Sequence, residues 1–112
     1  MAQRFEDDDS GTGVVTEQQS VTKPKKPRMF QVLMHNDNYT TREFVVEVLR
    51  GVFHKSENDA VAVMMHIHTR GVGIAGVFTK EIAETKIAQV HGMAERFEFP
   101  LRLSMEPEDS DD

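Results

Sequence analysis

Two groups of polar side chains in the 112-residue sequence are of types that bind or react with other molecules. Residues 35–40 read HNDNYT and follow the apolar run MFQVLM, which places an imidazole, two amides and a carboxylate close together. A turn between a strand and a helix needs only about two or three such residues. The excess leaves two interpretations open, a polar turn or a set of hydrogen-bonding groups aimed at a ligand.

The second group is the pair His66 and His68, which raises the hypothesis of a zinc site. On a strand the two rings would share a face, but on a helix two positions turn the chain by about 200° and separate them. A cap at Ser56 and a stop at Gly71 favour the helix. A metal-dependent enzyme is therefore the weakest hypothesis. His68 falls on the apolar face with Met64, either as a partly buried histidine bonded to a carbonyl or as a binding residue.

Other catalytic arrangements are missing from the sequence. The serines lie in the terminal segments, at a helix cap or near the end, so no nucleophile and base are paired. No phosphate-binding glycine loop or spaced carboxylate pair is present, and there are no cysteines. We expect a protein that is not an enzyme and that needs no cofactor and no metal.

The charge distribution and hydropathy limit the partners. The formal net charge of −6 is concentrated in the C-terminal EPEDSDD, so the remainder is nearly neutral and a nucleic-acid-binding face is not expected. No apolar run approaches the roughly 20 residues that span a bilayer. The acidic N-terminal sequence lacks the apolar segment of a signal peptide. We expect a soluble, cytoplasmic, monomeric protein without a membrane partner.

Composition divides the chain into three parts. Residues 1–27 are polar, with a charged, Pro-rich end, and are expected to be a disordered extension. Residues 28–105 hold the periodic apolar pattern and form the expected core domain. Residues 106–112 are expected to be an acidic disordered tail.

The apolar period changes along the core and predicts the order β-α-α-β-α-β. Strands are expected at 29–34, 73–78 and 101–105, and the three helices are expected to begin at caps on Thr40, Ser56 and Thr79. Thr40 and Glu43 have the spacing of a capping box. The predicted fold is a small α/β domain in which three helices pack on a three-stranded sheet. The third helix is expected to bury Ile82, Ala83, Ile87, Val90 and Ala94.

Several of these stretches together resemble one protein family. NDNYT-TREFVVEVL, AVAVMMHIHTRG and GVFTKEIAETK, in this order over about residues 29–105, closely resemble the ClpS adaptors of the bacterial N-end rule pathway. That family binds proteins whose first residue is Leu, Phe, Tyr or Trp and passes them to the unfoldase ClpA, which feeds the ClpP peptidase.

The resemblance implies roles for particular residues. The bound α-amino group would be met by Asn36, Asp37, Asn38 and His68, and the unfoldase, through the ClpA N-terminal domain, by Glu81 and Lys86. The apolar pocket would be formed by Thr40, Arg42, Val45, Met64, Ile67 and Leu101.

Two positions depart from the pattern of that family. Asn38 stands where a third-position Asp is usual, which removes one carboxylate from the amine site. Arg42 stands where an apolar Met is common, and its cation near a bound ammonium is unfavourable. We predict a divergent member, similar to a second paralogue, with a weaker or narrower preference. The alternative is an interaction module that docks on a AAA+ or ribosome-associated partner without binding N-termini.

Overall fold

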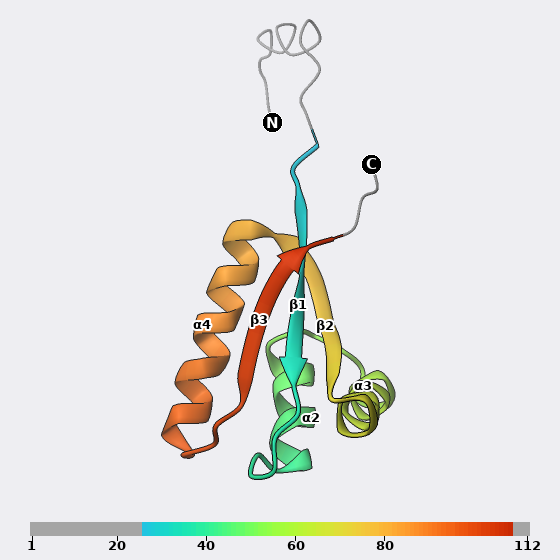
Figure 1. The fold of residues 1–112 in the computed structure, drawn as a ribbon, viewed down its shortest axis with the longest axis vertical. Coiled ribbons are helices and arrows are strands. Elements are labelled where there is room, and N and C mark those ends of the chain that lie inside the picture. The colour runs from blue at the N-terminus through green and yellow to red at the C-terminus, as the bar shows by residue number, and fades with distance from the viewer. Residues whose placement is uncertain (1–25, 109–112) are drawn as a thin grey trace, which may run out of the picture.

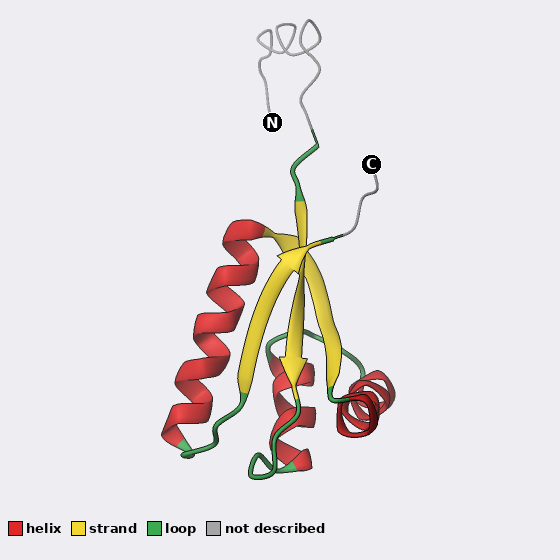
Figure 2. Cartoon of the chain, viewed as in Figure 1, coloured by secondary structure: helices red, strands yellow, loops and turns green. Residues whose placement is uncertain are grey.

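The computed structural model describes residues 26–108. Six elements follow one another in the predicted order β-α-α-β-α-β (Figure 2). They are β1 (Met29–His35), α2 (Arg42–Gly51), α3 (Glu57–Arg70), β2 (Val72–Thr79), α4 (Lys80–Arg96) and β3 (Arg102–Pro107). Residues 1–25 and 109–112, which hold most of the expected extension and tail, lie outside the described residues.

The three strands form one antiparallel sheet in the order β2-β1-β3. Because side chains alternate along a strand, Val32 and Met34 of β1 point to the helical side and are fully buried, while Gln31 and Leu33 lie on the opposite face. Helix α4 packs against all three strands, α3 against β2, and α2 against α3 (Figure 1). The predicted α/β architecture is confirmed.

Strand β3 is longer than the sequence pattern indicates. Glu106 and Pro107 still pair with Gln31 and Phe30 of β1. The amide of Glu108 then donates to the carbonyl of Met29 at 2.9 Å. The ordered pairing therefore continues past residue 105, the expected end of the core, because β1 offers partners over its whole length.

The cap of α2 is one residue later than predicted. Thr41, not Thr40, occupies the N-cap, and its Oγ1 accepts from the amide of Phe44 at 3.1 Å. The hydroxyl of Thr40 is used elsewhere, because it donates to the Asp37 carboxylate at 2.7 Å. With Thr41 as the cap, Glu43 is the second helical residue, so the capping box predicted from Thr40 does not form.

The predicted limits of α3 are confirmed. The Ser56 hydroxyl accepts from the amide of Asp59 at 3.1 Å, and Gly71 ends the helix in the left-handed conformation with φ of 92°. In α4, Thr79 occupies the N-cap position but makes no capping hydrogen bond through its side chain. Ile82 was expected to be buried and is 47% exposed.

Ile82 is exposed, contrary to the prediction, because of where the buried stripe runs along α4. The fully buried residues are Ala83, Val90 and Ala94, which repeat at intervals of seven and four positions along one line of the helix. Ile82 lies about 100° around the helix from Ala83 and so falls outside that stripe.

Candidate functional site

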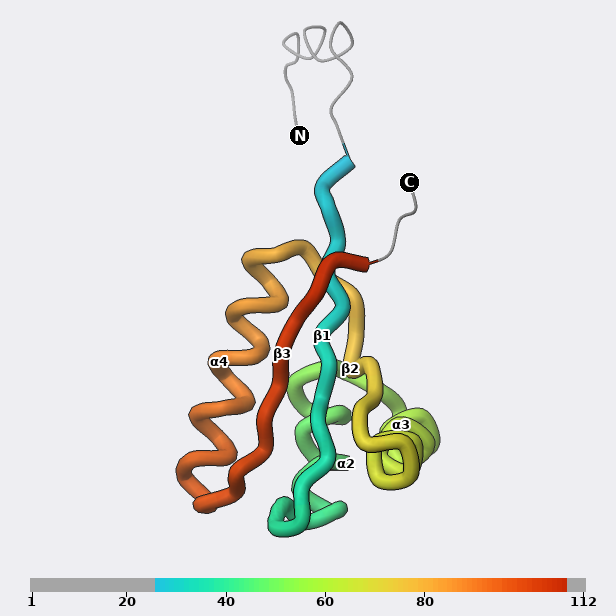
Figure 3. The backbone as a smooth tube through the Cα atoms, in the orientation of Figure 1, coloured from blue at the N-terminus to red at the C-terminus, as the bar shows by residue number. Residues whose placement is uncertain are grey.

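A hollow of about 470 Å³ lies at the end of the sheet where β1 runs into α2. The loop after β1 turns back beside the start of α2, as Figure 3 shows, and α3 supplies the remaining wall. Twelve residues line the hollow: Asn36, Asp37, Asn38, Tyr39, Thr40, Thr41, Arg42, Glu43, Val45, Met64, Ile67 and His68.

The loop is shaped by the Asp37 carboxylate. It accepts three hydrogen bonds, from the amides of Tyr39 at 2.8 Å and Thr40 at 2.7 Å and from the Thr40 hydroxyl. Burial raises the pKa of Asp37, but the three hydrogen bonds lower it by more, so that the pKa lies below its usual value. Asp37 is therefore an anion at neutral pH, and its oxygens are committed to holding the loop.

The base of the loop is fixed to both neighbouring elements. The amide of Asn36 donates to the carbonyl of Gly71 at 2.9 Å, which joins the loop to the end of α3. His35, just before the loop, hydrogen-bonds the Ser104 hydroxyl of β3 through Nε2 at 2.8 Å. Burial, and then the charge of Arg102, lower the pKa of His35 and favour its neutral form.

His68 faces the loop across the hollow and is exposed rather than partly buried. Its Nε2 lies 3.1 Å from Nη2 of Arg42, and within residues 26–108 no backbone carbonyl is its hydrogen-bond partner. A guanidinium can only donate, so this hydrogen bond requires Nε2 of His68 to be the acceptor. Arg42 and His68 thus join the start of α2 to the last turn of α3.

The floor of the hollow is apolar. Val45 and Ile67 are buried in the core and Met64 is partly buried against it, and each also lines the hollow. Thr40 lines it as expected. Leu101, the remaining predicted pocket residue, does not line the hollow and is 5% exposed in the core beneath the sheet. Polar acceptors at the mouth and apolar walls behind them suit a ligand with a cationic head and a hydrophobic group.

Three lining residues were not identified from the sequence as contributors to a site. Tyr39, Thr41 and Glu43 reach the hollow because they belong to the same loop and first helical turn as Asp37. Tyr39 is 76% exposed, an unusual position for the only tyrosine of the chain. Tyr39 belongs to the polar stretch HNDNYT, which is the signal available for it, whereas Thr41 and Glu43 follow that stretch, where the sequence predicts only the start of a helix.

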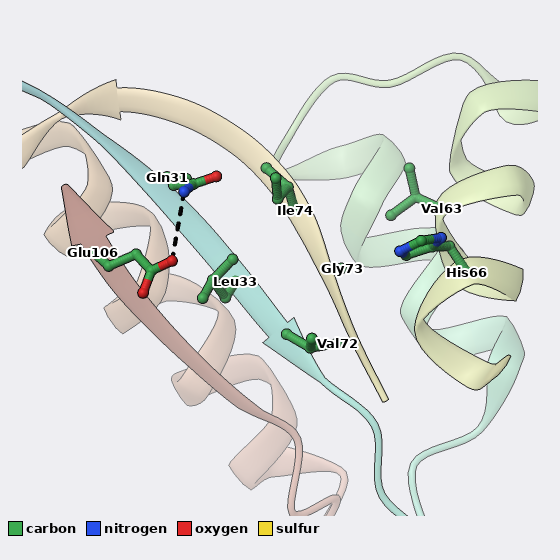
Figure 4. A pocket seen from close by; sticks show the side chains of 8 residues that line it. All are labelled: Gln31, Leu33, Val63, His66, Val72, Gly73, Ile74 and Glu106. Carbon is green, nitrogen blue, oxygen red and sulfur yellow. Dashed lines mark hydrogen bonds between the residues drawn. The ribbon is translucent and has the colours of Figure 1, made fainter. Parts of the chain in front are cut away.

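His66 and His68 line different hollows, as helical spacing predicts. His66 contributes to a hollow of about 510 Å³ on the open side of the sheet, near Gln31 and Ile74 (Figure 4). Among residues 26–108, no group of three or more His, Cys, Asp or Glu side chains is arranged to hold a metal ion. Within that same range, no helix is long and apolar enough to cross a membrane.

The two residues expected at an unfoldase interface have different surroundings. Glu81 is exposed in the first turn of α4, beside a hollow that also includes Pro27 and Phe30. Lys86 is partly buried, and its Nζ donates to the carbonyl of Val52 at 2.8 Å. Lys86 is therefore engaged inside the domain, whereas Glu81 is available at its surface.

Gly73 of β2 supports the wall of the site from behind. A Cβ at this position would lie 2.7 Å from Cγ1 of Ile67, which lines the hollow. We predict that Gly73→Ala lowers the free energy of unfolding by about 1–3 kcal/mol, because the buried Ile67 must shift or change rotamer. Urea unfolding measures this effect. Gly92→Ala in α4 is the control, since the added Cβ meets nothing within 4 Å beyond the backbone of its own helix and its two chain neighbours. Equal stability of both variants would contradict the prediction.

Comparison with known proteins assigns the chain to a family. The family model described as ATP-dependent Clp protease adaptor protein ClpS matches residues 25–104. The chain belongs to the ClpS family. Among curated ClpS adapter proteins, the one from Myxococcus xanthus is 59% identical over 109 residues, covering 97% of this chain and 99% of the relative. The one from Desulfatibacillum aliphaticivorans is 60% identical over 86 residues, covering 77% and 83%.

A solved ClpS structure has the same fold. The structure of Agrobacterium tumefaciens ClpS2 bound to L-phenylalaninamide matches with a TM-score of 0.71 and 40% sequence identity, covering 74% of this chain and all of that chain. The chain is thus an adaptor of the ATP-dependent Clp protease by family, and not itself a protease.

Proposed function

We propose that this chain binds proteins that begin with an unblocked, bulky hydrophobic residue (N-degrons beginning with Leu, Phe, Tyr or Trp) and delivers them to the ClpA unfoldase for degradation by ClpP. The observation that carries the proposal is the hollow between the loop and α3, where polar acceptors surround the mouth and apolar side chains form the walls. Its volume of about 470 Å³ is within the usual range of small-ligand sites, about 300–1,000 Å³.

The mouth of the hollow suits an ammonium group. Asn36 and Asn38 line the hollow and each has an amide oxygen that can accept a hydrogen bond, and Nε2 of His68 accepts one when it carries no proton. The ionised Asp37 adds negative charge without giving up its hydrogen bonds to the loop. A hydrogen bond from a charged donor contributes about 1.5–3 kcal/mol, so an amine that loses its charge loses most of this stabilisation.

The walls suit the side chain of the first residue. Burial of a Leu or Phe side chain against Val45, Met64 and Ile67 contributes roughly 1.5–3 kcal/mol. L-Phenylalaninamide, the ligand named for the Agrobacterium relative, combines a free α-amino group with a benzyl side chain. The proposed site asks for the same two features in one ligand.

Delivery requires a second surface for the ClpA N-terminal domain. Glu81 and the neighbouring residues at the start of α4 are exposed and lie at the opposite end of β1 from the hollow, since Thr79 pairs with Met29. We assign docking to this end of the domain, so that a substrate in the hollow and the unfoldase do not compete for space. Lys86, the second residue assigned to this surface, is partly buried and also donates to the carbonyl of Val52.

A reconstituted degradation assay tests the proposal. With purified ClpA and ClpP, the chain should accelerate loss of a fluorescent reporter that begins with Phe but not of the same reporter beginning with Gly. His68→Ala should remove the acceleration while leaving binding to ClpA intact, and His66→Ala, which alters the other hollow, should behave as wild type. If the chain binds ClpA but treats both reporters alike, it is an interaction module and not an N-degron adaptor.

A further inference from the structure

Arg42 stands where the proposed binding hollow meets a second one. The second hollow, about 350 Å³, runs along α2 toward the start of α3 and includes Val46, Arg50 and Glu57. It shares Arg42, Glu43 and Met64 with the first. A peptide held by its first residue in the first hollow has this shared rim beside its following residues.

Glu43, Glu47 and Glu57 line the second hollow together with Arg42, but within the described part of the chain the guanidinium of Arg42 makes no hydrogen bond to any of them. Among residues 26–108, the polar partner of its guanidinium is Nε2 of His68, 3.1 Å away, and not a carboxylate. Glu43 also lines both hollows, but adjacent helical residues point in different directions and do not pair.

The ammonium group of a bound N-terminus would repel the Arg42 cation, unless the ligand itself supplies a negative charge that pairs with Arg42. The ammonium would use the same side of His68 that Arg42 occupies, which brings two cations close together. A carboxylate on the second residue of the ligand is within reach of Arg42, since consecutive Cα atoms are about 3.8 Å apart and a Glu side chain extends further. Such a carboxylate would pair with Arg42 and draw it away from His68, leaving Nε2 free to accept from the ammonium.

We propose that Arg42 makes the site select ligands with an acidic second residue, in addition to the bulky hydrophobic first residue. This inference rests on the proposed N-degron function. The expected substrates of this chain begin with a bulky hydrophobic residue followed by Glu or Asp. Sequences with Lys or Arg as the second residue are expected to bind more weakly.

Peptide binding measured by fluorescence anisotropy tests the selection. Three peptides begin Phe-Glu, Phe-Gln and Phe-Lys and are otherwise identical, and each is also made with an acetylated N-terminus. Wild type should bind Phe-Glu roughly three- to fivefold more tightly than Phe-Gln, the range of a partly exposed ion pair, with Phe-Lys weakest. Raising the salt concentration should reduce the differences in affinity among the three peptides, because salt screens the interaction between charges.

Two charge-removing variants assign the effect to one side chain. Arg42→Gln keeps a hydrogen-bond donor at the rim but should bring the Phe-Glu to Phe-Gln ratio close to one. Arg50→Gln removes the same charge from the neighbouring hollow and should leave the ratio as in wild type. A ratio of one in wild type, or a ratio that persists in Arg42→Gln, overturns the inference.

The acetylated peptides separate this inference from the function on which it rests. If free peptides bind more tightly than acetylated ones whatever the second residue is, the N-degron function stands and only the selection by Arg42 fails. If free and acetylated peptides bind alike, the proposed function fails and the inference fails with it.

Discussion

Replacing Asp37 by Ala is expected to weaken binding of a Phe-starting peptide by at least about tenfold and to lower the free energy of unfolding by about 1–3 kcal/mol. The carboxylate accepts from two amides and one hydroxyl within the loop, and no other group in the loop makes these bonds. Without it, Asn38 and Thr40 lose the fixed positions from which they line the hollow, whereas Asn36 is still held by its bond to the Gly71 carbonyl. Binding must then also order the loop, which costs affinity.

Asp37→Asn separates geometry from charge. The amide oxygen can still accept from the amides of Tyr39 and Thr40, so most of the loop structure should remain. The negative charge beside the proposed amine site is lost. We therefore expect Asp37→Asn to bind with an affinity between those of wild type and Asp37→Ala, and to be more stable than Asp37→Ala.

The contribution of the Asp37 carboxylate to stability should be lost at acidic pH. The pKa of Asp37 is lower in the folded protein than in the unfolded chain, so its contribution to stability is present above the unfolded value of about 3.9 and is lost as pH falls through the folded value. The stability of wild type should therefore fall more steeply below about pH 4 than that of Asp37→Asn. Urea unfolding at pH 7 and pH 3 measures this. Binding by Asp37→Ala within twofold of wild type, or parallel acid profiles, would contradict the assigned role.

The second large effect is expected at Lys86. Its ammonium donates to the carbonyl of Val52, the C-cap residue of α2, and lies over the rings of Phe53 and Phe78 at 5.9 and 5.4 Å from their centroids. Carbonyls at the end of a helix lack partners within the helix, so the bond from Lys86 gives the Val52 carbonyl a hydrogen-bond partner that the helix itself does not provide. Lys86→Met keeps the apolar stem but removes the charge, and should cost about 1–3 kcal/mol.

Thermal unfolding measures the effect of Lys86→Met. A loss of 1 kcal/mol lowers Tm by about 4–8 °C in a domain of this size, so a fall of several degrees is expected. Lys80→Met, at the exposed start of the same helix, is the matched control and should stay within about 0.5 kcal/mol of wild type. Equal melting of the two variants would mean that the internal bond contributes nothing. Tests of unfoldase docking are better made at Glu81, which is exposed in the first turn of α4 and, among the described residues, makes no side-chain hydrogen bond like that of Lys86.

The order of elements was predictable because the apolar period and the caps are local signals. Ser56 and Gly71 bound α3 as their types indicate, through a side-chain cap and a left-handed residue. Which of Thr40 and Thr41 caps α2 was not predictable from the sequence, because the Thr40 hydroxyl donates to the Asp37 carboxylate and Thr41 is left as the cap. Local patterns identify candidate caps but do not show which candidate is already engaged by another side chain.

The site was predictable in its residue types and not in its contacts. The loop and His68 come together because the Asn36 amide bonds the carbonyl of Gly71, a contact between distant parts of the chain. The pairing of Arg42 with His68 spans 26 positions, and no periodicity encodes it. Val45, Ile67 and Leu101 are all core residues, but Leu101 does not line the hollow, and only packing decides which core residues reach it.

The central claim is that the hollow beside α3 recognises a free α-amino group together with a bulky side chain. Fluorescence anisotropy with one labelled Phe-starting peptide, free or N-acetylated, tests it most directly. The free peptide should bind at least about tenfold more tightly, since acetylation removes both the charge and the donors that the mouth of the hollow accepts. Equal affinities for the free and acetylated peptides would contradict the account.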